Sequence, residues 1–259
     1  MSLDKQQEMP ESNTSSLRCK KYFAPDARNK GERNMKLIVD FANLDQIKEL
    51  YAYYPVDGVT TNPSILAKEG KNPYEVLKGI REFIGVNAEL HVQVISLDAE
   101  GMVQEAHRIQ KELGANTYVK VPVTKEGLKA MKALAAEGAN ITATAIYTQM
   151  QAYLAGKAGA HYAAPYINRI DNLGADGVKV AKEIHDIFKK NDLKTEVLAA
   201  SFKNSQQVLE LAKYGVGAAT ISPDVIEGLI KLDSVACAVA AFTKDFEGLC
   251  GKGKSMLDC

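Results

Sequence analysis

The stretch Tyr118-Val-Lys-Val-Pro-Val-Thr124 places one lysine, Lys120, inside an otherwise apolar run of strand-forming residues. Val119, Val121 and Val123 are typical of a strand that is buried on both faces. Lys120 therefore either reaches water at the end of the strand, as charged side chains usually do, or has an amine that is buried away from solvent. Burial lowers a lysine pKa and leaves a free amine that can form a Schiff base with a carbonyl compound. The stretch taken alone favours the solvent-exposed alternative.

The composition indicates one globular domain without a large charge. The 259 residues include 32 Lys plus Arg and 32 Asp plus Glu, and 46% of them are hydrophobic. This length and apolar fraction suit a single domain with a sizeable core. The balanced charge gives no electrostatic case for a nucleic acid or an anionic membrane as the main partner. A small anionic ligand needs only one or two basic residues and stays possible.

Cysteine spacing and hydropathy narrow the class of protein further. Cys19, Cys237, Cys250 and Cys259 form no CxxC pair and no Cys/His ligand set, so we expect neither a structural zinc nor a disulfide framework. No apolar run approaches the length of a membrane span, and the N-terminus lacks the hydrophobic core of a signal peptide. A reducing, cytoplasmic location is the default expectation.

From Met35 onward, short apolar strands alternate with amphipathic helices. We expect strands at 36–41, 58–61, 90–94, around Lys120, and at 141–145, 162–166, 196–200 and 218–221. The intervening helices are expected at 44–54, 73–84, 99–113, 125–137, 149–157, 177–190 and 206–214, with an eighth from residue 223 and another at 235–246. Residues 1–34 are polar and are expected to be a disordered N-terminal extension or a leader ahead of Met35. Residues 35–251 then form the folded domain and residues 252–259 a C-terminal tail.

Eight strands, each followed by a helix, in about 225 residues predict an α/β fold, a single (β/α)8 TIM barrel with an additional C-terminal helix. A doubly wound open sheet is the rival. It would need a glycine-rich turn after the first strand, but Asp40-Phe-Ala-Asn-Leu-Asp45 contains no glycine. The barrel is therefore preferred.

Polar residues that end apolar strands become the candidates for an active site, because barrel enzymes assemble their sites at the carboxyl ends of the strands. A lysine central in such a ring cannot easily reach past the loops to water, so the barrel context favours a reactive amine at Lys120. The candidates are Asp40, Thr60, Thr61, Asn62, Gln93, Lys120, Thr144, Tyr166, Arg169, Ser201 and Lys203.

Four ordered segments carry a family resemblance. They are Val59-Thr-Thr-Asn-Pro-Ser-Ile65, Val119-Lys-Val-Pro-Val-Thr124, Ala164-Pro-Tyr-Ile-Asn-Arg-Ile-Asp171 and Leu198-Ala-Ala-Ser-Phe-Lys203. These segments resemble the signature segments of the transaldolase family, and the likeness extends from Met35 to about Gly251. In length the chain is similar to the small-subunit branch, which includes fructose-6-phosphate aldolase and the short microbial transaldolases.

The resemblance implies a class I mechanism that needs no metal and no cofactor. It assigns to Lys120 the Schiff base with the ketose carbonyl, after which the C3–C4 bond breaks and leaves a dihydroxyacetone enamine. It places Asp40 near the donor hydroxyls, with a part in handling the C4 hydroxyl proton, and Thr60 and Asn62 among the substrate-binding residues. The alternative for Asp40 is a helix cap, although Asp45 lies closer to the following helix and is the better cap candidate.

The same resemblance implies that Gln93, Thr144 and Tyr166 hold a catalytic water. True transaldolases carry a glutamate and a phenylalanine where this chain has Gln93 and Tyr166, a pair similar to that of fructose-6-phosphate aldolase. A tyrosine hydroxyl can exchange a proton with the water, which would help to quench the enamine and free dihydroxyacetone. The pair therefore favours a lyase.

Arg169 and Ser201 match the positions that hold the sugar phosphate, since a guanidinium and a hydroxyl suit phosphate oxygens. An ion pair with Asp171 is the alternative for Arg169. Lys203 either adds to the positive charge or lies outside the pocket. For three further residues the alternative is a purely structural role. Thr61 and Ser64 would then satisfy backbone groups in the loop, and His91 would be a packed core histidine rather than a group that acts on the catalytic water.

The function that follows is cleavage or formation of the C3–C4 bond of a ketose phosphate such as fructose 6-phosphate, giving dihydroxyacetone and glyceraldehyde 3-phosphate. The alternative is a true transaldolase of the pentose phosphate pathway, which passes the three-carbon unit from sedoheptulose 7-phosphate to glyceraldehyde 3-phosphate. A non-catalytic sugar-phosphate-binding protein would not need a buried lysine, and a class II aldolase would need a His/Glu ligand set that the sequence lacks. The resemblance also implies a homo-oligomer, a decamer of two pentameric rings in which the C-terminal helix reaches a neighbour.

Overall fold

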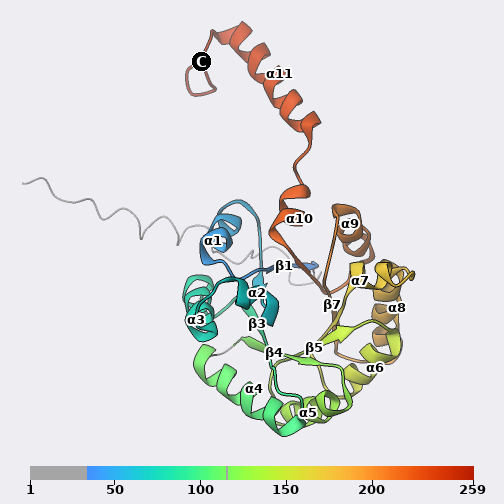
Figure 1. Cartoon of the computed structure of the whole chain (residues 1–259). Helices are drawn as coiled ribbons and strands as arrows, with labels where there is room; N and C mark the ends of the chain where they lie inside the picture. Colours follow the sequence, from blue (N-terminus) through green and yellow to red (C-terminus); the bar gives the residue numbers. More distant parts are fainter. Residues whose placement is uncertain (1–33, 115) are drawn as a thin grey trace, which may run out of the picture. The chain divides into compact units, whose positions relative to one another are not determined.

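Eight parallel strands close into a barrel in chain order, as the sequence predicts (Figure 1). The computed structural model describes residues 34–114 and 116–259. The predicted extension of residues 1–34 lies outside the described residues apart from Asn34. The strands are β1 (Lys36–Asp40), β2 (Gly58–Thr60), β3 (Glu89–Gln93), β4 (Thr117–Pro122), β5 (Ile141–Ile146), β6 (Tyr162–Pro165), β7 (Glu196–Ala199) and β8 (Ala218–Ile221). Strand β1 pairs with both β2 and β8, which closes the barrel.

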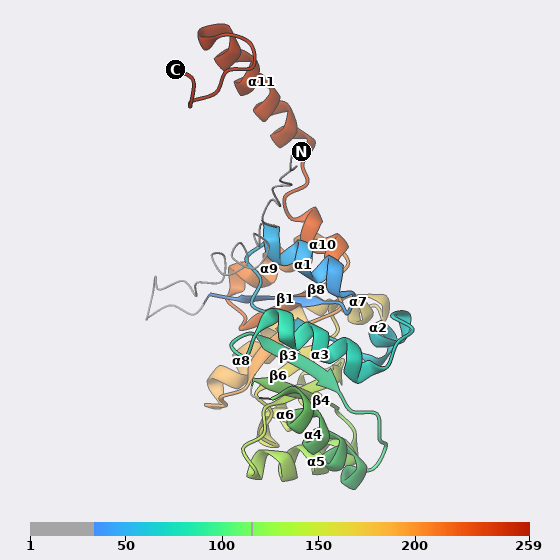
Figure 2. The ribbon, with the colours of Figure 1, turned by 90° about the vertical axis from the view of Figure 1, so that its left-hand side faces the viewer.

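Apart from the C-terminal helix, the helices surround the strands, as the two perpendicular views show (Figures 1 and 2). Those that the sequence predicts are α1 (Leu44–Tyr53), α3 (Pro73–Ile84), α4 (Ala99–Leu113), α5 (Lys125–Ala136), α6 (Gln149–Lys157), α8 (Gly177–Lys190), α9 (Ser205–Tyr214), α10 (Pro223–Gly228) and α11 (Asp233–Cys250). Two short helices, α2 (Pro63–Lys68) and α7 (Ile167–Asn172), follow strands β2 and β6 and are not expected from the sequence. Both lie where the site is built.

Side chains on most helix N-termini satisfy the free N–H groups of the first turn. Asn43 is the cap of α1 and accepts a hydrogen bond from the Gln46 N–H. The prediction that Asp45 caps this helix is therefore wrong, because the helix begins at Leu44 and Asp45 lies in its first turn. Asp40 lies three residues ahead of the cap and is free for another role.

The barrel wall separates two groups of side chains. In β4, Val119 and Val121 belong to the apolar core that the helices cover. The alternate residues point to the opposite face, where Tyr118 packs with Tyr162 in the smaller cluster that fills the barrel interior. Lys120 shares the face of Tyr118, so the strand carries its amine into the barrel rather than between sheet and helix.

The C-terminal part differs from its prediction in one respect. Helix α11 exposes Val235, Val239 and Phe242 at helical spacing, as expected for an amphipathic segment. Cys250 and Cys259, however, are joined by a disulfide, a pair that the sequence analysis, which expects no disulfide framework, does not predict. The two cysteines are nine residues apart, and the turn after α11 brings them together in a way that spacing alone does not indicate. Within the described residues, no helix is both long and apolar enough to cross a membrane.

Candidate active site

A cavity of about 300 Å³ opens at the carboxyl ends of the strands. All nine residues for which the sequence predicts a catalytic or substrate-binding role line it: Asp40, Thr60, Asn62, Gln93, Lys120, Thr144, Tyr166, Arg169 and Ser201. They come from seven strand ends that are distant in sequence, and barrel closure brings them together. The polar lining suits a hydroxylated ligand more than an apolar one.

Lys120 lies on β4 with only 7% of its surface exposed. Its Nζ donates a hydrogen bond of 2.8 Å to the Thr61 carbonyl oxygen, so the amine does not reach past the strand end to bulk water. Burial lowers the Lys120 pKa, an effect that the Asp40 carboxylate opposes. The Thr61 hydroxyl donates to the His91 carbonyl, which is the backbone role that the sequence allows for it. A buried amine with a lowered pKa is the form of lysine that attacks a carbonyl.

Asp40 ends β1 and faces the same cavity. The Thr60 hydroxyl donates a 2.7 Å hydrogen bond to Asp40 Oδ1, and Thr60 is also hydrogen-bonded to Thr220. Burial raises the Asp40 pKa, while Lys120, Thr60 and Arg169 act in the opposite direction. A carboxyl group with a raised pKa, next to a lysine with a lowered pKa, is suited to accept a proton from a bound ligand and to return it.

Thr144 and Tyr166 form one wall of the cavity. Their hydroxyl oxygens are 2.9 Å apart. The strand irregularity that presents Thr144 lies between Ala143 and Ile146, where Ala145 has a φ of 58°. A left-handed alanine is costly, and such strain is concentrated at functional sites. The sequence carries no signal for this irregularity.

Arg169 is exposed at the rim of the cavity on α7. Its guanidinium carbon lies 4.6 Å from the centroid of the Tyr166 ring, and a hydrogen bond with Tyr147 raises the Arg169 pKa. Asp171 instead accepts hydrogen bonds from the Gly177 N–H and the Gln207 side chain. The position of Asp171 as an anchor of α8 and α9 argues against the ion-pair alternative for Arg169.

Ser201 follows β7 with a φ of 60°, a second strained residue at the cavity. Its carbonyl accepts from the Asn168 N–H in the first turn of α7, which ties the Ser201 and Arg169 segments together. Lys203 is exposed and does not line the cavity. Asn62 also caps α2 by accepting from the Ile65 N–H, so it has a structural task besides its place in the cavity.

Some lining residues were not singled out as functional from the sequence. Thr220 interrupts the apolar strand β8 in the manner of the other candidates and could have been found by the same signal. Ser64, for which only a backbone role is weighed, also lines the cavity. The apolar lining residues Pro63, Ala164, Leu198 and Ala200 carry no such signal.

Comparison with known proteins identifies the family to which this barrel belongs. The family model described as transaldolase/fructose-6-phosphate aldolase matches residues 37–253. A probable fructose-6-phosphate aldolase of Streptococcus pneumoniae is 44% identical over 213 residues, which cover 82% of this chain and 96% of that protein. A probable transaldolase of Methanococcus maripaludis is 43% identical over 213 residues, covering 82% of this chain and 98% of that protein.

Among solved structures, a mandelate racemase/muconate lactonizing enzyme-like protein from Rubrobacter xylanophilus superposes with a TM-score of 0.52 and 15% identity. The match covers 74% of this chain and 57% of that one, and it supports the barrel fold alone. The sequence relatives go further, because their identity extends over nearly their whole length. The chain therefore belongs to the small-subunit branch of the transaldolase/fructose-6-phosphate aldolase family of enzymes.

Proposed function

We propose that the protein is a class I aldolase that cleaves or forms the C3–C4 bond of a ketose phosphate such as fructose 6-phosphate through a Schiff base on Lys120. The observation that carries the proposal is the buried amine of Lys120, 7% exposed and facing a polar cavity. The names of the relatives support the reaction class, since both an aldolase and a transaldolase are among them. Asp40, Arg169 and Ser201 line the same cavity, where such a substrate would need them.

In the proposed reaction, the Lys120 nitrogen attacks the C2 carbonyl carbon and the resulting carbinolamine loses water to give a protonated imine. Asp40 takes the proton of the C4 hydroxyl. The electrons of the C3–C4 bond then move toward the imine nitrogen, so that an aldehyde phosphate leaves and an enamine of dihydroxyacetone stays on the enzyme. Protonation of the enamine carbon and addition of water release dihydroxyacetone and restore the amine.

Arg169 and Ser201 are proposed to hold the phosphate of the leaving aldehyde at the rim. This geometry keeps the charged group in contact with solvent while the reacting carbons lie deeper, next to Lys120.

Lyase and transferase differ in the fate of the enamine. The lyase is favoured by the Thr144–Tyr166 hydroxyl pair, which lies 2.9 Å apart in the wall of the cavity and can hold a water with Gln93. The test is to supply fructose 6-phosphate alone and to measure free dihydroxyacetone. Release without an added aldose phosphate supports the lyase, whereas turnover only with such an acceptor makes the protein a true transaldolase of the kind that serves the pentose phosphate pathway.

Replacing Tyr166 with Phe removes the hydroxyl and keeps the ring under Arg169. We expect dihydroxyacetone release to fall by about 10²-fold, because a general acid–base group is lost. Transfer of the three-carbon unit to erythrose 4-phosphate should fall much less, since the acceptor aldehyde itself consumes the enamine. The measurement compares the rates of dihydroxyacetone release and of transfer in the same variant. An equal loss of both activities would count against a role for Tyr166 in protonating the enamine.

Replacing Arg169 with Met should raise KM for glyceraldehyde 3-phosphate in the synthetic direction by about 10–100-fold, because a charge-assisted hydrogen bond contributes about 1.5–3 kcal/mol. KM for unphosphorylated glyceraldehyde should change by less than about twofold. The matched control is Lys203→Met, which removes a positive charge outside the cavity. A similar rise for both aldehydes would indicate a structural rather than a phosphate-binding role.

The assembly and its setting are also proposals. The exposed residues Val235, Val239 and Phe242 of α11 provide an apolar surface that would be covered by a second copy of the chain, which supports a homo-oligomer such as the ring-built decamer. No charge pattern favours a nucleic acid or a membrane partner, and a cytoplasmic location fits sugar-phosphate substrates.

A further inference from the structure

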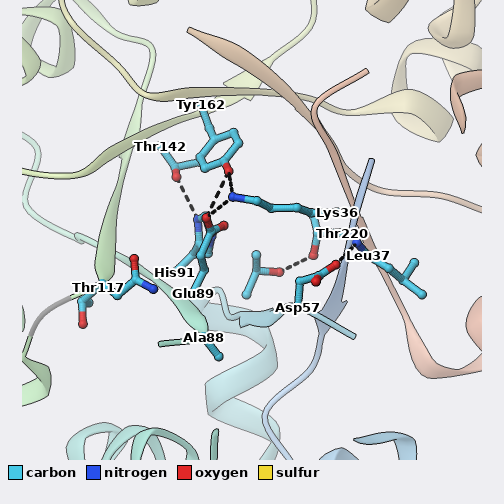
Figure 3. A network of polar contacts seen from close by, with 12 residues as sticks. Lys36, Leu37, Asp57, Ala88, Glu89, His91, Thr117, Thr142, Tyr162 and Thr220 are labelled. Carbon is cyan, nitrogen blue, oxygen red and sulfur yellow. Dashed lines mark hydrogen bonds and ion pairs between the residues drawn. The ribbon is translucent and has the colours of Figure 1, made fainter. Parts of the chain in front are cut away.

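A network of polar side chains that includes Lys36, Glu89, His91, Thr142 and Tyr162 lies in the barrel interior (Figure 3). Lys36 Nζ lies 2.5 Å from Glu89 Oε1 and donates to the Tyr162 hydroxyl oxygen at 2.9 Å. The Tyr162 hydroxyl donates in turn to the same Glu89 oxygen at 3.1 Å. The Glu89 carboxylate is thus buried and paired with a lysine whose side chain keeps 42% of its surface exposed.

His91 connects this ion pair to the next level of the barrel. Its Nε2 lies 3.3 Å from Glu89 Oε2, and its Nδ1 lies 2.9 Å from Thr142 Oγ1. A carboxylate only accepts hydrogen bonds, so the proton is assigned to Nε2, and Nδ1 then accepts from the Thr142 hydroxyl. The ring is fully buried and stacks on Tyr118 with centroids 4.7 Å apart. The neutral imidazole therefore satisfies both nitrogens.

Strand register places His91 between the ion pair and Lys120. Gln93 of β3 pairs with Lys120 of β4, and His91 pairs with the residue two positions earlier. Thr142, the partner of His91 on β5, pairs with Lys120 from the other side. Glu89 lies a further two residues below His91, about 7 Å along the strand. The imidazole ring of His91 thus separates the charges of Lys36 and Glu89 from the level of the barrel at which Lys120 lies.

The protonation states of the network leave it without net charge. Burial would raise the Glu89 pKa, but hydrogen bonds from His91 and Lys36 outweigh burial and lower it to about 2. Burial lowers the Lys36 pKa, but the hydrogen bond and charge of Glu89, together with Tyr118 and Glu196, raise it on balance. Burial also lowers the His91 pKa and outweighs the hydrogen bond and charge of Glu89, which act in the opposite direction. At neutral pH one cation, one anion and one neutral imidazole result.

The other ionisable groups that act on this region come from several elements. Asp40 ends β1, and Asp57 lies in the loop before β2. Strand β4 contributes Tyr118 and Lys120, β6 contributes Tyr162, β7 contributes Glu196, and Arg169 lies at the rim of the cavity. Burial raises the pKa of both Tyr118 and Tyr162, so both stay neutral. Among the network's hydrogen-bonded members, Lys36 and Glu89 are then the charged ones.

We propose that the Lys36–Glu89 ion pair, held in place through His91, is an electrostatic positioning element whose two charges cancel at Lys120, so that the buried Glu89 carboxylate does not disturb the proton affinity of the reactive amine. The inference rests on the proposed role of Lys120. Lys36 and Glu89 are the first residues of β1 and β3, so their ion pair lies at the amino end of the barrel, on the far side of His91 from Lys120. In this account, each single charge has an effect of opposite sign on Lys120, and the pair has none.

The test is the proton affinity of Lys120, measured by competitive acetylation with trace acetic anhydride from pH 6 to 11 and read at the Lys120 peptide by mass spectrometry. This readout does not depend on catalysis. Glu89→Gln leaves an uncompensated positive charge and should lower the Lys120 pKa by about half a unit to one unit. Lys36→Met leaves a negative charge and should raise it by a similar amount. The double variant should return to within about 0.2 units of wild type.

The matched control is the surface ion pair of Lys78 and Glu112, which has the same 2.5 Å separation. Lys78→Met and Glu112→Gln should each move the Lys120 pKa by less than about 0.2 units, because solvent screens them. Should Glu89→Gln fail to fold, Lys36→Met still tests the proposal, because Lys36 is partly exposed and its replacement is expected to raise the Lys120 pKa.

Shifts of the same sign in both single variants, or none in either, would overturn the proposal, because a loss of stability or packing has no reason to act with opposite signs. A different observation would show that the proposed function itself is wrong. It would appear as an absence of any sugar adduct on wild-type Lys120, whereas the acetylation profiles of the variants would still report whether the ion pair acts on the amine.

Discussion

Replacing Lys120 with Met is expected to lower kcat/KM for fructose 6-phosphate cleavage by about 10⁴-fold or more, because the covalent route disappears with the amine. Met keeps the length of the side chain and suits the buried position on β4. The matched control is Lys129→Met, an exposed lysine on α5, for which less than a twofold change is expected. Residual activity above about 1% in the Lys120 variant, with the fold intact, would contradict the Schiff-base account.

The pH dependence of the wild-type enzyme follows from the same residue. Burial lowers the Lys120 pKa, so the free amine is present at a lower pH than for an exposed lysine. The rate of imine formation should rise with pH as the amine loses its proton and level off above its lowered pKa.

Replacing Asp40 with Asn is expected to reduce carbon–carbon cleavage by about 10²–10⁴-fold, the range for removing a general base. The amide still accepts the Thr60 hydrogen bond seen in the wild-type site. Imine formation should survive, so borohydride should still label Lys120 in this variant, although more slowly. Asp45→Asn, at an exposed carboxylate five residues away, is the control. A loss of both labelling and cleavage would place Asp40 in an earlier step or in folding.

The alternation of apolar strands and amphipathic helices was enough to predict the barrel, because eight βα units of this length have few other ways to bury their strands. The same reasoning gave eleven candidates at strand ends, and the nine to which the family resemblance assigns a role line the cavity. Helices α3, α4, α6 and α8 have the predicted bounds. The roles of the nine residues stay predictions until they are tested.

Other features had no signal in the sequence. Helices α2 and α7 have six residues each, too few for helical periodicity to show. The left-handed backbone at Ala145 and Ser201 is imposed by tertiary packing on residues that do not favour it. The cap at Asn43 rather than Asp45 reflects a boundary that propensity cannot fix to one residue.

His91 illustrates the limit of single-residue reasoning. Its alternation with Gln93 indicates the barrel interior, and a packed core histidine is the commoner outcome. The structure supports that outcome, since the ring is buried with both nitrogens hydrogen-bonded. Its partner Glu89 lies two residues earlier on β3, whereas its partner Thr142 lies on β5, and only the register of β3, β4 and β5 brings Thr142 to the ring.

The most direct test of the central claim is to incubate the wild-type protein with fructose 6-phosphate or dihydroxyacetone, reduce with borohydride, and map the modified peptide by mass spectrometry. The account predicts one reduced three-carbon adduct per chain, on Lys120, with no label when borohydride or donor is omitted. An adduct on another lysine, or none with either donor, would contradict it.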